Sequence, residues 1–92
     1  MANLIAKKTW RNAAAFIKVD ENGNCRVYGK FYDEGRGYPG PETGILKKLS
    51  PELLEEAQTL NFLSPRSSEM EKNIKEIWAM AKEQEPWFKY GL

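Results

Sequence analysis

The sequence has no histidine and only one cysteine among its 92 residues. Without histidine, the chain lacks the usual general base of enzyme sites and the commonest metal ligand. A single cysteine without histidine cannot build a zinc site or a Cys–His nucleophile, and it leaves no partner for an intramolecular disulfide. We therefore expect a protein that is not an enzyme, with no catalytic residues, no metal site and no cofactor.

Long apolar runs are also missing. Leu4-Ile5-Ala6 is the only apolar stretch near the start of the chain, and it is too short for a signal peptide. No segment approaches the ~20 apolar residues of a membrane span. Apolar and charged fractions of 41% and 29% are typical of a globular protein. These features predict a cytoplasmic protein with no membrane partner, in which residues 1–92 form one domain around one core.

The clearest local pattern is a β-hairpin from Ala13 to Tyr32, with Asp20-Glu21-Asn22-Gly23 at its turn. A two-residue loop would mix apolar and charged side chains on each face, whereas a three-residue loop makes one face wholly apolar. The second register pairs the apolar-face residues as Val19–Cys25, Ile17–Val27, Ala15–Gly29 and Ala13–Phe31. We therefore predict this register, a left-handed Gly23 and a buried, unreactive Cys25.

Two helices are predicted after the hairpin. Ser50-Pro51-Glu52 combines a capping hydroxyl, a proline at the first helical position and an acid, and the helix should end near Leu60. A second helix should begin between Ser64 and Ser68, where Ser68 to Glu71 fits a capping box, and Pro86 should stop it. Its core-facing residues at helical spacing are Met70, Ile74, Ile77, Trp78 and Ala81. We expect Trp78 to fill the shallow dent above Ala15 and Gly29.

The remaining segments have weaker patterns. Residues 1–9 are interpreted as a polar lead-in, and residues 33–44 as a long exposed loop because they contain four glycines and two prolines. Residues 43–49 are a possible additional edge strand. Trp87 to Leu92 either folds back onto the core or docks on a partner. The predicted fold class is α+β, with a small antiparallel sheet built on a hairpin over residues 10–32 and two C-terminal helices on one face.

The other face of the hairpin alternates basic and aromatic side chains. Lys18 would lie across from Arg26 with no acidic side chain in the strands to offset them, so an external anion would relieve the repulsion. A purely structural explanation is that aromatic residues favour strands while lysine and arginine hydrate an outer face. Together with two residues of the glycine-rich segment, the candidate partner-binding residues are Phe16, Lys18, Arg26, Tyr28, Lys30, Tyr32, Arg36 and Tyr38.

The charge distribution and the missing chemistry together indicate a binding function. The net charge is only +1, but residues 1–49 hold nine basic against five acidic residues, and residues 50–92 hold five against eight. We expect a non-catalytic inhibitor or adaptor that docks on a larger host assembly, such as a nucleic-acid-processing complex. Phages and other mobile elements often encode small proteins of this kind. The alternative is direct binding of single-stranded RNA or DNA, with bases stacked on aromatic rings and phosphates held by cations.

Overall fold

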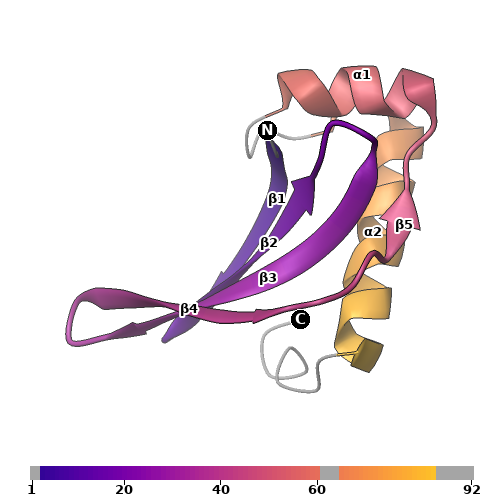
Figure 1. The fold of residues 1–92 in the computed structure, drawn as a ribbon. Coiled ribbons are helices and arrows are strands. Elements are labelled where there is room, and N and C mark those ends of the chain that lie inside the picture. The colour runs from indigo at the N-terminus through magenta and orange to yellow at the C-terminus, as the bar shows by residue number, and fades with distance from the viewer. Residues whose placement is uncertain (1–2, 61–64, 85–92) are drawn as a thin grey trace.

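A computed structural model describes residues 3–60 and 65–84 and confirms the predicted α+β class. An antiparallel sheet in the order β1-β2-β3-β4 is followed by two helices, and a short fifth strand pairs with β3 (Figure 1). The elements are β1 (Asn3–Trp10), β2 (Ala13–Val19), β3 (Asn24–Asp33), β4 (Arg36–Glu42), β5 (Lys47–Lys48), α1 (Pro51–Thr59) and α2 (Ser68–Gln84). Neither helix is long and apolar enough to cross a membrane, within the part of the chain described.

The β2–β3 hairpin has the predicted register. Val19 pairs with Cys25, Ile17 with Val27, Ala15 with Gly29 and Ala13 with Phe31. Gly23 has a φ of +86°, as the three-residue loop requires. Cys25 is fully buried, and burial raises the pKa of its thiol to about 12, so the thiol stays protonated and unreactive at neutral pH.

The two helices cover the apolar face of this hairpin. Ser50 caps α1 through a hydrogen bond from the Leu53 amide, as predicted. The predicted inward residues of α2 are buried, and Trp78 is only 7% exposed in the same core cluster as Ala15. The Lys8 ammonium lies 5.8 Å from the centre of the Trp78 ring, and Lys8 pairs with Ala15. Trp78 is therefore part of the core between the helices and the sheet, close to Lys8 of β1.

The cap of α2 differs from the predicted capping box. The Met70 amide donates to the hydroxyl of Ser67 at 3.1 Å, so the cap is Ser67 and the helix begins at Ser68. The helix is described as far as Gln84. The proposed start at Ser64, the stop at Pro86 and both alternatives for Trp87 to Leu92 concern residues outside the described ranges.

The prediction of a polar lead-in before the hairpin was wrong. Residues 3–10 form β1, which pairs along the whole length of β2. A bulge between Leu4 and Ala6 interrupts the alternation, so Ile5 is buried and the neighbouring Ala6 also packs against the core. This irregularity, followed by two lysines, hid the strand pattern in the sequence.

The prediction of a long loop over residues 33–44 was also wrong. β4 pairs with the distal half of β3 through a tight turn at Glu34 and Gly35, with φ values of 50° and 82°. Positive φ at both central residues is the geometry of a type I′ hairpin turn. Gly40 is required by close approach, because a Cβ there would lie 2.9 Å from the backbone carbon of Gly29. Prolines are tolerated because β4 is an outer strand of the sheet.

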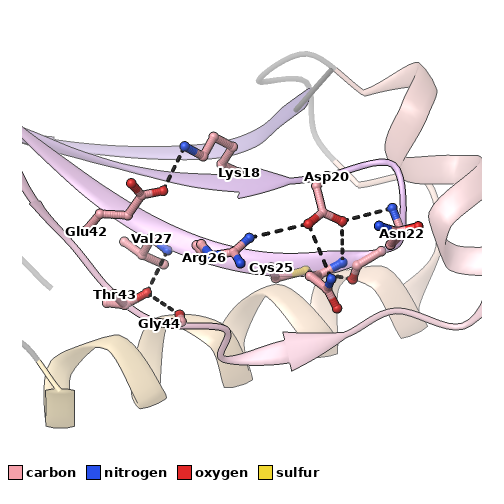
Figure 2. Close-up of polar contacts among 11 residues, drawn as sticks. Lys18, Asp20, Asn22, Cys25, Arg26, Val27, Glu42, Thr43 and Gly44 are labelled. Atoms are coloured by element: carbon pink, nitrogen blue, oxygen red, sulfur yellow. Dashed lines mark hydrogen bonds and ion pairs between the residues drawn. The ribbon is translucent and has the colours of Figure 1, made fainter.

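The predicted edge strand over residues 43–49 is reduced to β5, which pairs with Asn24 and Cys25. Between β4 and β5, the buried side chain of Thr43 takes the place of a strand partner. Its hydroxyl accepts from the Val27 amide at 3.0 Å and donates to the Gly44 carbonyl at 2.9 Å (Figure 2). The backbone of β3 along this edge therefore remains hydrogen-bonded between the end of β4 and the start of β5.

Candidate binding surface

We call the side of the sheet that points away from the two helices the outer face. The strand pairings place six of the candidate residues on it, namely Phe16, Lys18, Arg26, Tyr28, Lys30 and Tyr32. The flanking strands add further residues to the same face. Leu4 and Lys7 come from β1, opposite Lys18 and Phe16, and Glu42 comes from β4, opposite Tyr28. The outer face is therefore wider than a hairpin and contains an acidic residue.

The expected repulsion between Lys18 and Arg26 is relieved within the chain. The Lys18 ammonium lies 2.7 Å from a carboxylate oxygen of Glu42 (Figure 2). It also lies 5.3 Å from the centre of the Tyr28 ring. The Arg26 guanidinium lies 3.3 Å from a carboxylate oxygen of Asp20. The prediction that no acidic side chain in the strands offsets these cations was wrong for Lys18, because Glu42 belongs to β4, which was interpreted as a loop. Arg26 is offset by Asp20 of the hairpin turn. An external anion is therefore not needed to neutralise them.

Asp20 also holds the hairpin turn together. One carboxylate oxygen accepts from the amides of Asn22 and Asn24, at 2.9 and 3.0 Å, while the other faces Arg26 and the side chain of Asn24. The Asn24 amide contributes most to lowering the pKa of the Asp20 carboxyl below its ordinary value, against the opposing effect of partial burial. Arg26 is thus part of a structural turn, which lowers its value as a contact for a partner.

The aromatic residues of the outer face differ in accessibility. Phe16 and Tyr28 stack with ring centres 5.0 Å apart, and Phe16 is only 8% exposed, so its ring is not available as a stacking platform. Partial burial raises the pKa of Tyr28, although Lys18 acts in the opposite direction. Tyr32 is 41% exposed, and the Lys30 ammonium lies 5.7 Å from the centre of its ring. Among the aromatic candidates of the outer face, Phe16, Tyr28 and Tyr32, the most accessible is Tyr32.

Arg36 and Tyr38 do not extend the outer face. Tyr38 pairs with Phe31 and Arg36 with Asp33, so both belong to the side opposite Lys30 and Tyr32. We call the two-stranded projection formed by residues 30–39 the ribbon; Figure 1 shows it extending beyond the helices. The two-residue turn at its tip fixes this pairing. The eight candidate residues are therefore divided between two surfaces of the same structure.

A hollow of about 520 Å³ lies on the outer face. Its lining draws on all four long strands and consists of Leu4, Phe16, Tyr28, Gly29, Lys30, Gly37 and Pro39. This volume is within the usual range of ligand pockets. The sequence analysis missed Leu4, Gly37 and Pro39, because their position depends on β1 and β4. If Glu34-Gly35 had been recognised as a two-residue hairpin turn, a strand would have been predicted after it, with Gly37 and Pro39 beside Lys30.

The chemistry of the described residues gives no sign of a metal centre. No group of three or more potential metal-ligating side chains occurs within residues 3–60 and 65–84. Comparison with known proteins finds no matching family model, curated protein or solved structure.

Proposed function

We propose that this protein is a non-catalytic binding protein, an inhibitor or adaptor that docks on a larger protein assembly through the ribbon and the adjoining outer face. The observation that supports the proposal is the concentration of exposed aromatic residues on the ribbon. Phe31, Tyr32 and Tyr38 are 38%, 41% and 45% exposed on a projection that the helices do not cover. Exposed tyrosines on a projecting element are well suited to fill pockets of a protein partner.

The charges of this region favour a protein partner over nucleic acid. On the ribbon, Lys30 and Arg36 are balanced by Asp33 and Glu34. Beside it, Lys18 and Arg26 already pair with carboxylates. Nucleic-acid binding draws most of its affinity from cations that neutralise phosphates, and a balanced surface supplies little of it. Direct binding of single-stranded nucleic acid remains the second candidate because Lys30 and Tyr32 combine a cation with an accessible ring.

Affinity capture from cells, followed by mass spectrometry, tests the docking surface when wild type is compared with matched variants. The double variant Tyr32→Ser/Tyr38→Ser removes one aromatic residue from each side of the ribbon. Ile45→Ser is the control, because Ile45 is 52% exposed but lies outside the ribbon. We expect one partner to be captured by wild type and Ile45→Ser and lost by the double variant. Capture of the same partner by all three proteins would contradict the proposed surface.

Titration with labelled single-stranded oligonucleotides at two salt concentrations separates the two candidates. A protein-docking function predicts no appreciable affinity at either concentration. Affinity that falls steeply with salt and is lost in the Tyr32→Ser variant would instead support direct nucleic-acid binding.

A further inference from the structure

We propose that the hollow on the outer face receives an aromatic or long aliphatic side chain of the protein partner, and that Lys30 pairs with a carboxylate next to that side chain. The inference rests on the proposed function and specifies the partner's chemistry. Of the residues that line this hollow, only Lys30 is charged. The arrangement therefore suits an apolar anchor beside one acidic group.

The aromatic part of the lining is already ordered before a partner binds. Phe16 is buried and stacks on Tyr28 at an interplanar angle of 15°. Lys18 lies over the Tyr28 ring and is itself held by Glu42. Rings that are fixed in this way lose little conformational freedom on binding, so burial of an apolar side chain against them contributes more fully to affinity.

The charge of Lys30 favours a partner that has a carboxylate beside its apolar side chain. Lys18, Arg26, Lys47 and Lys75 each pair with a carboxylate, whereas Lys30 has no ion pair with another residue in the part of the chain that the structure describes. Its ammonium lies 5.7 Å from the centre of the Tyr32 ring, which leaves the charge able to attract a carboxylate. The Lys18–Glu42 pair nearby is neutral overall, and Lys30 adds a positive charge at the hollow itself.

Gly37 keeps the hollow open. A Cβ at this position would lie 2.5 Å from the Lys30 Cε and 3.6 Å from a ring carbon of Tyr32. A larger side chain there must push aside the flexible lysine stem and occupy the space beside it. Gly37 has no positive φ, so a substitution adds bulk without backbone strain. Gly37→Leu is therefore a direct way to obstruct the site.

The experiment measures amide NMR shifts of the full chain with two small probes, phenylpropionate and its neutral amide, phenylpropionamide. Both present an aromatic ring, but only the first has a carboxylate. We expect saturable shifts around Tyr28 and Lys30 with millimolar affinity, and about two- to fivefold tighter binding of the acid, the scale of an exposed ion pair. Lys30→Met should abolish the difference between the probes. Gly37→Leu should abolish binding of both, while Ile45→Ser should bind as wild type does.

Absence of shifts at the hollow, or equal affinity for both probes in wild type, would overturn the inference. Should Gly37→Leu fail to fold, as judged by circular dichroism, Gly37→Ala is the smaller obstruction and should weaken both probes. Capture of the cellular partner by the same variants separates this inference from the proposed function. Loss of capture with Tyr32→Ser/Tyr38→Ser but not with Lys30→Met or Gly37→Leu would refute the hollow and leave the docking function standing. Capture unaffected by any of them would refute both.

Discussion

The two hairpins that share β3 are fixed by different forces. The β2–β3 hairpin has one face beneath the helices, and its residues there, Val19, Cys25 and Val27 among them, are buried. The β3–β4 ribbon is exposed on both faces from Lys30 to Pro39. A one-residue slip in the first hairpin would expose the core, whereas a slip in the ribbon would bury or expose little. Burial therefore specifies the first hairpin, and backbone geometry at glycines specifies the second.

Truncating a core side chain between the helices and the β2–β3 hairpin should lower stability much more than truncating a side chain on the ribbon. Trp78→Ala takes away a buried indole above the sheet, and we expect a loss of about 3–5 kcal/mol in the free energy of unfolding. Tyr38→Ala on the ribbon is the counterpart and should change it by less than about 0.5 kcal/mol. Urea denaturation monitored by circular dichroism measures both. Similar losses in the two variants would show that the ribbon is part of the cooperative core.

The two left-handed glycines compare the hairpin turns directly. Gly23 and Gly35 have φ values of +86° and +82°, so valine introduces similar backbone strain at each. A Cβ at Gly23 would also meet the Leu49 carbonyl oxygen at 3.1 Å, whereas one at Gly35 meets nothing within 4 Å. We expect Gly23→Val to cost about 3 kcal/mol of global stability. Gly35→Val should be relieved by local opening of the ribbon tip, with less than about 1 kcal/mol lost globally.

Amide hydrogen exchange supplies the second measurement for this pair. In Gly35→Val the loss of protection should be confined to the ribbon. Loss of protection in β2 as well would mean that the ribbon is coupled to the core.

The junction between the two regions depends on Thr43. Thr43→Val keeps the shape of the side chain but leaves the buried Val27 amide without its acceptor. We expect a loss of about 1–2 kcal/mol in the free energy of unfolding. Thr43→Ser, which retains the hydroxyl, is the control and should be closer to wild type. Thermal melting of both variants tests this, and equal losses would show that the methyl group, not the hydrogen bond, stabilises the junction.

The smallest expected effect concerns how the stabilising contribution of Asp20, in the β2–β3 turn, changes at acidic pH. Hydrogen bonds lower the folded-state pKa of Asp20, so its stabilising contribution is complete above its ordinary pKa and disappears as the pH falls through the lowered value. The stability difference between wild type and Asp20→Asn should therefore be constant near neutral pH and shrink below about pH 4. Denaturation across this range measures the difference. A difference that grows on acidification would mean that the carboxyl pKa is raised.

The sequence predicted the part of the fold that is determined by the burial of apolar side chains. The hairpin register, the α+β class and the buried stripe of α2 followed from apolar periodicity and from the turn at Gly23. β1 could not be predicted in this way because its bulge places Ile5 and Ala6 on the same side and ends the alternation. β4 lacks buried side chains altogether, so nothing in its hydrophobic pattern distinguishes it from a loop.

The candidate site was predictable only within the first hairpin. The six residues proposed for its outer face do share that face. The two missed strands changed their chemistry, since β4 supplies Glu42 to neutralise Lys18 and completes the hollow with Gly37 and Pro39. Arg36 and Tyr38 lie on the face opposite to the other six candidates. The two-residue turn sets Arg36 across from Asp33 and Tyr38 across from Phe31, and this pairing does not depend on the type of side chain.

The outer strands of the sheet have a consequence for how this protein avoids aggregation. β1 and β4 end the strand order, and an unprotected outer strand is a template on which further chains can add. Each of the two has an irregularity in its pairing, and each bears residues that discourage strand addition, Lys7 and Lys8 on β1 and Pro39 and Pro41 on β4. Charges resist close stacking of like strands, and prolines withhold backbone donors. Exposed tyrosines can thus be displayed on a projecting β-ribbon without turning it into a seed for fibrils.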